Sequence, residues 1–104
     1  TFTITSNGSA DYVFASDGTF FPTPVNDPVL YLRRGETYVF VNNSGGSHPL
    51  QIRLAANSGA YNTGVTNNGA NSGNITFVVP MSAPNTLYYQ CTAHSAMGNT
   101  INIV

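Results

Sequence analysis

The chain consists of short runs in which apolar and polar residues alternate, separated by clusters of Asn, Gly, Ser and Pro. Alternation with a period of two is typical of a β-strand that buries one face. No stretch has the 3.6-residue period of an amphipathic helix, and there is no internal repeat. The expected strands are residues 1–5, 11–15, 29–32, 37–41, 50–54, 74–79, 87–91 and 100–104.

These strands predict an all-β fold, an antiparallel Greek-key β-sandwich of about seven to eight strands. A chain of 104 residues is long enough to bury a hydrophobic core, and residues 1–104 are expected to form a single domain. The turn at Arg33–Glu36 is interpreted as a hairpin, with Gly35 where a positive φ is needed. Residues 55–72 lack periodicity, which predicts a mobile surface excursion. Adjacent Phe20 and Phe21 are expected to cover one end of the core, and the alternative is a hydrophobic docking patch.

The composition excludes some partners and indicates a location. Charged residues make up 7% of the chain, lysine is absent and the net charge is −1, so neither nucleic acid nor an anionic membrane surface is expected as an electrostatic partner, and the lack of a long apolar run argues against insertion into a membrane. One cysteine excludes an internal disulfide. No apolar run is long enough to span a membrane, and no signal peptide precedes Thr1. The Asn-, Ser-, Thr- and Gly-rich composition favours a periplasmic or extracellular protein, including one on a virion or cell surface.

Three soft-donor side chains lie close together near the C-terminus. Cys91, His94 and Met97 fall within seven positions, although the chain has one cysteine, two histidines and two methionines. A thiolate and imidazoles with a weak thioether ligand are the donors of copper sites that cycle between Cu(I) and Cu(II). The other histidine, His48, follows an alternating segment far upstream. The candidate metal site is therefore His48, Cys91, His94 and Met97, with one copper ion as the cofactor.

Other interpretations of these residues were weighed. Cys91 alone would be a buried structural thiol, and Met81 lacks neighbouring donors and is assigned no ligand role. A Cys-His nucleophile would need an orienting acid and an oxyanion hole, which the loop does not supply. Zinc could use Cys91 and both histidines, but a methionine at the axial spacing favours copper. Multicopper oxidase chemistry would need more histidines than the chain contains.

The residues resemble those of the cupredoxins, the small blue copper proteins. Residues 28–42 look like the family's alternating strand, glycine-acid turn and second strand ending in Asn. Residues 42–48 resemble the plastocyanin segment that carries the first copper histidine. The loop from Cys91 to Met97 is similar to that of amicyanin, with two residues between Cys and His and two more between His and Met. The resemblance covers the chain from about Pro28 onward.

The resemblance implies a two-sheet sandwich with type 1 copper near one end and a role in one-electron transfer, without enzymatic activity. His94 would then present an imidazole edge to solvent as the route for the electron, and the Cys91 thiolate would dominate the electronic structure of the site. An unidentified redox partner is expected to dock on the apolar rim around His94, formed by Pro49, Ala93 and Ala96. Since the chain is nearly uncharged, docking should depend little on salt. The protein is expected to be a monomer.

Three functions remain open from the sequence. The first is an electron carrier. The second is a copper-binding module of a larger secreted, surface or virion protein without a dedicated carrier role. The third is a domain for adhesion or assembly in which the metal only stabilises the loop. A complete ligand set favours the first two.

Overall fold

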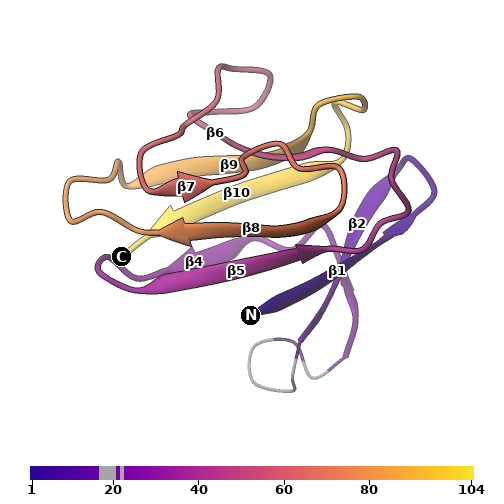
Figure 1. The fold of residues 1–104 in the computed structure, drawn as a ribbon, viewed down its shortest axis with the longest axis horizontal. Coiled ribbons are helices and arrows are strands. Elements are labelled where there is room, and N and C mark those ends of the chain that lie inside the picture. Colours follow the sequence, from indigo (N-terminus) through magenta and orange to yellow (C-terminus); the bar gives the residue numbers. More distant parts are fainter. Residues whose placement is uncertain (17–20, 22) are drawn as a thin grey trace.

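The computed structural model describes residues 1–16, 21 and 23–104, and within them it contains ten strands and no helix (Figure 1). Six strands form one sheet, in the order β3-β2-β1-β5-β8-β7, and four form the other, in the order β4-β10-β9-β6. Their apolar faces meet in one core. The strands are β1 (Phe2–Asn7), β2 (Asp11–Ser16), β3 (Val25–Asn26), β4 (Leu30–Leu32), β5 (Thr37–Asn42), β6 (Leu50–Arg53), β7 (Val65–Thr66), β8 (Gly73–Val78), β9 (Thr86–Cys91) and β10 (Gly98–Ile103).

The predicted β-sandwich is confirmed, but its two sheets are mixed. Most neighbouring strands are antiparallel, whereas β1 pairs in parallel with β5, and β4 in parallel with β10. The chain leaves the larger sheet after β3, adds β4 to the smaller sheet and returns to the larger one as β5. This crossing brings β5 alongside β1 in the same direction. Two strands were missed in the sequence, β3 and β7, because two residues are too few to show a period.

The turn between β4 and β5 is not the hairpin that the sequence predicts, because these strands belong to different sheets. Gly35 does have a positive φ, of 84°. Its N–H donates to the Val79 carbonyl (2.8 Å), and the Val79 N–H donates to the Glu36 carbonyl (2.9 Å). The turn therefore carries the chain from one sheet to the other. A hairpin turn within one sheet and a turn between two sheets can have the same residues, so the sequence alone could not distinguish these two possibilities.

The side chains of β9 alternate largely as predicted. Leu87, Tyr89 and Cys91 are fully buried in the core between the sheets. Gln90 points to the opposite face but is also buried, since its side chain makes reciprocal hydrogen bonds with Asn57. The thiol of Cys91 thus lies in the interior at the end of a strand, where an unpaired charge would be costly.

The 55–72 segment, predicted to be a mobile surface excursion, pairs with both sheets, and its mobility stays a prediction. It runs along the edge of β6 and contributes β7 to the edge of the other sheet. The Asn68 side chain accepts a hydrogen bond from the Ile52 N–H (2.7 Å) and donates to the Ile52 carbonyl (3.0 Å), as a neighbouring strand would. The segment thereby covers an edge that would otherwise be open to pairing with another chain.

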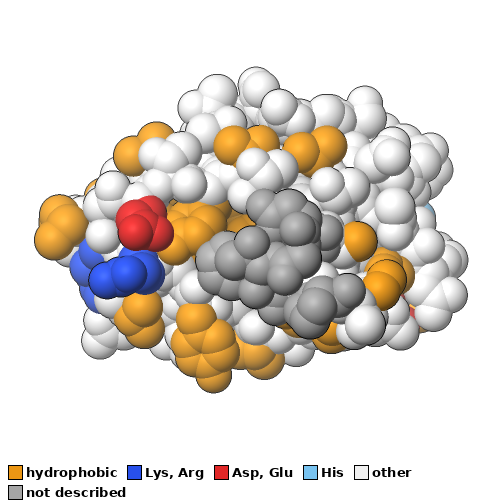
Figure 2. All heavy atoms as spheres, turned by 90° about the horizontal axis from the view of Figure 1, so that it is seen from below, with side chains coloured by type: hydrophobic (Ala, Val, Ile, Leu, Met, Phe, Trp, Pro, Cys, Tyr) orange, Lys and Arg blue, Asp and Glu red, His pale blue; other side chains and the backbone are white. Residues whose placement is uncertain are grey.

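The two adjacent phenylalanines have different outcomes. Phe21 packs against the core, with its ring 6.1 Å from that of Phe2 and 5.9 Å from that of Phe14, as expected of a residue that covers the core. Phe20 lies outside the described residues. Figure 2 shows one face of the molecule, on which uncharged side chains predominate and the basic and acidic ones gather mainly at one end.

We expect Asn68→Ala to lower the free energy of unfolding by about 1–3 kcal/mol, because it leaves the Ile52 N–H without its acceptor and removes donors to the carbonyls of Ile52 and Tyr61. Chemical denaturation would measure the loss, and hydrogen exchange should quicken at the Ile52 amide. Asn43→Ala is the matched control, because Asn43 is exposed and its side chain makes no hydrogen bond within the described residues. Equal effects of the two substitutions would contradict this role of Asn68.

Candidate metal centre

The first histidine is delivered by the connection between β5 and β6. This connection is a turn cluster, in which Gly45 and Gly46 both have positive φ, and it ends at His48, two residues before β6 begins at Leu50. His48 is 7% exposed. Its position is coupled to the other end of the site because β6 pairs with β9, with Leu50 opposite Cys91.

The remaining candidate ligands come from the end of β9 and the loop before β10. The loop is closed by backbone hydrogen bonds, from the Cys91 N–H to the Met97 carbonyl (2.9 Å) and from the Met97 N–H to the His94 carbonyl (3.1 Å). The Thr92 N–H donates to the Pro49 carbonyl (3.0 Å), which ties this loop to the segment that carries His48. Two chain segments far apart in sequence therefore meet at one end of the sandwich.

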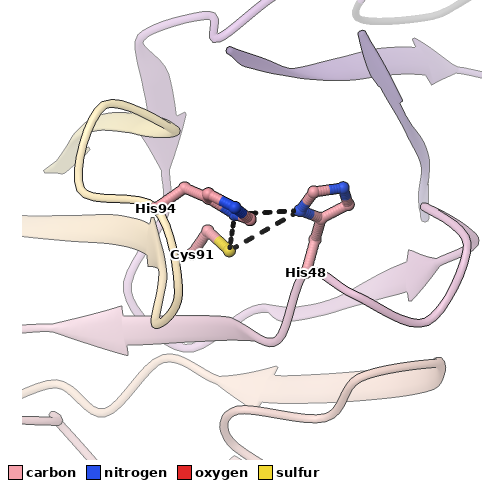
Figure 3. A group of neighbouring side chains, drawn as sticks. All are labelled: His48, Cys91 and His94. Carbon is pink, nitrogen blue, oxygen red and sulfur yellow. Dashed lines mark hydrogen bonds between the residues drawn. The ribbon is translucent and has the colours of Figure 1, made fainter. Parts of the chain in front are cut away.

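The structure brings together three of the four candidate ligands (Figure 3). The Nδ1 atoms of His48 and His94 are 3.2 Å apart, and they lie 3.9 and 3.5 Å, respectively, from Cys91 Sγ. A point equidistant from these three atoms lies about 2.1 Å from each, close to the ~2.0–2.3 Å of metal–imidazole and metal–thiolate bonds. Cys91 and His48 are buried and His94 is half-buried. The side chains thus point at a common centre of the size of a metal ion.

The donor set restricts the kind of metal. It consists of one sulfur and two imidazole nitrogens, without a carboxylate in the group. Magnesium and calcium prefer oxygen ligands, whereas imidazole with thiolate suits copper or zinc. The residues present therefore fit the copper ion that the sequence motifs imply.

Met97 is fully buried in the core cluster that also contains Cys91. Its backbone is held by the hydrogen bonds that close the loop. Its role as the fourth ligand stays a prediction. Met81, which the sequence did not assign to the site, is 74% exposed.

Two buried residues that the sequence did not single out support His48. The Tyr12 hydroxyl and the Asn42 side-chain amide both donate to the His48 carbonyl oxygen, each at 2.9 Å. Tyr12 is an alternating residue of β2, and Asn42 is the last residue of β5. No local signal in the sequence shows that either would reach His48.

A half-buried acid lies next to this support. Asp27 Oδ1 accepts a hydrogen bond from the Tyr12 N–H (2.9 Å), and its own carbonyl accepts one from the Asn99 side chain (2.8 Å). Burial raises the pKa of Asp27 to about 6, and the neighbouring Asp11 carboxyl adds to the increase, while the Tyr12 N–H opposes it. Asp27 also has a positive φ of 39°.

A hollow elsewhere in the molecule contains none of the candidate ligands. It has a volume of about 320 Å³ and is mainly apolar, and its walls include Phe2, Phe21, Val29, Leu30 and Tyr31. These side chains offer no soft donor for a metal.

No protein-family model and no curated protein matches the chain. Among solved structures, rusticyanin from Thiobacillus ferrooxidans is similar over 99% of this chain and 75% of its own, with 18% identity and a TM-score of 0.49. Two rusticyanin variants are similar at the same identity, with TM-scores of 0.48 and 0.46. At this identity and with TM-scores below 0.5, these similarities carry no weight for function.

Two features that the resemblance to cupredoxins implies are present in the chain's own structure. Its two sheets form a sandwich, and the histidine of the first motif meets the cysteine and histidine of the second at one end of it.

We expect Asp27→Asn to increase stability at pH 7. A native-state pKa raised from 3.8 to about 6 means that the folded protein binds this proton more tightly, so the free energy of unfolding falls as the pH rises from about 4 to about 6. Asparagine keeps a side-chain oxygen that can accept the hydrogen bond from the Tyr12 N–H. Because it cannot ionise, it avoids the loss of stability that the buried carboxylate causes above about pH 4. Urea denaturation at pH 4 and pH 7 would measure it.

Asparagine also tolerates a positive φ better than most residues, but that gain is independent of pH. The substitution should therefore raise the free energy of unfolding more at pH 7 than at pH 4, and the difference between the two gains is the part due to the carboxylate. An equal increase at both pH values would contradict the raised pKa.

Proposed function

We propose that this chain is a type 1 copper protein that transfers single electrons, with copper held by His48, Cys91 and His94, and with Met97 as a weak fourth ligand. The observation that carries the proposal is the triangle of two Nδ1 atoms and one Sγ, whose size suits one metal ion. The donor set is the one that copper uses in electron-transfer sites, with two imidazoles, a thiolate and a long thioether contact.

When bound, copper supplies a one-electron couple, and the protein's residues determine how well that couple works. The Cys91 thiolate lies in the core, so the charge of the metal would offset the cost of burying its own negative charge. The backbone hydrogen bonds across the Cys91–Met97 loop, and the one from Thr92 to Pro49, hold the donors in place. A rigid set of ligands disfavours rearrangement between the two oxidation states.

His94 is the ligand through which an electron would enter or leave, because it is half-buried while His48 and Cys91 are buried. Around it Ala93 and Ala96 are exposed and Pro49 is half-buried. We propose that a redox partner protein docks on this uncharged rim, with little dependence on salt. The protein would act as a monomer, without enzymatic activity of its own, and would not bind nucleic acid.

The same site also suits the alternative function of a copper-binding module in a larger secreted, surface or virion protein. Under either function, we propose a periplasmic or extracellular location. In the described part of the chain, no helix is long and apolar enough to cross a membrane. A reversible copper couple would favour the carrier over the module.

The first test is addition of one equivalent of Cu(II) to the metal-free protein. We expect an intense visible thiolate-to-copper band and a narrow hyperfine splitting in electron paramagnetic resonance, because a copper–thiolate bond mixes metal and sulfur orbitals. Cys91→Ser should lose the visible band. A colourless complex of the unmodified protein would rule out the type 1 site.

The two methionines allow a test of the fourth ligand. Met97→Leu conserves volume in the buried core, so the protein should fold and bind copper, but its reduction potential should shift because a thioether contact to the metal is lost. Met81→Leu is the matched control, because Met81 is 74% exposed, and its potential should equal that of the unmodified protein. Cyclic voltammetry would measure the reduction potentials of the two variants and of the unmodified protein. An unchanged potential in Met97→Leu would exclude Met97 as a ligand.

A further inference from the structure

The carbonyl oxygen of His48 is held by two donors from the opposite sheet. The Tyr12 hydroxyl comes from β2, the Asn42 amide comes from β5, and both lie 2.9 Å from this oxygen. Tyr12 is 0% and Asn42 1% exposed. A backbone carbonyl oxygen has two lone pairs, so it accepts both donors at once and is held from two directions.

Both donors are themselves fixed in place. The Asn42 amide also donates to the Ala70 carbonyl (2.9 Å), which ties it to the segment covering the sheet edge. Tyr12 is held through its own N–H by Asp27, and its ring lies edge-on to the His48 imidazole, with centroids 6.5 Å apart. Residues with such restricted side chains can restrict a third residue in turn.

We infer that Tyr12 is a positioning residue of the metal centre: its hydroxyl, together with Asn42, fixes the backbone of His48 and so aims the His48 imidazole at the metal before the metal binds. This inference rests on the proposed copper site and identifies what prepares that site. Groups behind a ligand commonly control its orientation and the affinity for the metal.

The test is Tyr12→Phe, which removes one oxygen atom and leaves the ring in the core. Because Asn42 still satisfies the His48 carbonyl, the variant should fold with nearly unchanged thermal stability. The affinity for Cu(II), measured by competition with a chelator, should fall about tenfold, the lower end of effects seen when a group behind a ligand is lost. The hyperfine splitting of the copper complex should widen as His48 moves.

Tyr89→Phe is the matched control. Tyr89 is also 0% exposed, its hydroxyl also donates to a backbone carbonyl, that of Pro28 at 2.6 Å, and its ring lies 6.4 Å from that of Tyr12. Its hydroxyl does not contact the His48 carbonyl, so affinity and spectrum should match those of the unmodified protein. Equal changes in both variants, or none in Tyr12→Phe, would overturn the inference.

A metal-free measurement separates this inference from the proposed function. Because the chain has two histidines, their imidazole signals are readily distinguished by ¹⁵N nuclear magnetic resonance. In metal-free Tyr12→Phe the His48 signal should shift or broaden, and by more than the signal of His94, whose Nδ1 lies 3.2 Å from that of His48. An unaltered His48 signal would overturn the inference even if copper binds as proposed. Failure of the unmodified protein to form a blue copper complex would instead refute the proposed function.

Discussion

The pairing of β6 with β9 is the constraint on which the metal centre depends. Its register places Leu50 opposite Cys91 and is extended by the hydrogen bond from the Thr92 N–H to the Pro49 carbonyl. His48 and Cys91 are 43 positions apart in sequence, yet this register sets them side by side. A shift by one residue would turn Cys91 from the core to the opposite face of the sheet. The geometry of the site is thus a consequence of strand pairing.

The polar groups around the centre are satisfied by hydrogen bonds within the protein. The polar side-chain atoms that are buried in the described part of the chain all have hydrogen-bond partners. Asn42 connects the turn that carries His48 to Ala70, so the covered sheet edge and the metal centre share one network. Networks in which every member is satisfied restrict the core to one arrangement. For the proposed electron carrier, this restriction is useful because both oxidation states would find the same ligand positions.

The strands with clear alternation were predictable, because a buried face imposes a period of two. The core positions of β9 follow directly from it. The connections were not predictable. The turn at Gly35 has the residues of a hairpin, but Val79 binds its backbone and the chain crosses to the other sheet. The 55–72 segment has no period because side chains such as Asn68, rather than a regular strand, pair with the edge of β6.

The sequence by itself determined eight of the ten strands in the described residues, the buried face of β9 and the rare donor residues from which the metal site was predicted. It could do so because alternation and local spacing are properties of neighbouring residues. Only the tertiary structure decided that both imidazoles direct Nδ1 toward Cys91 Sγ, that two pairs of neighbouring strands run parallel, and that Tyr12 and Asn42 meet at the His48 carbonyl. These contacts join residues distant in the chain, and they depend on how two sheets pack, which no local pattern encodes.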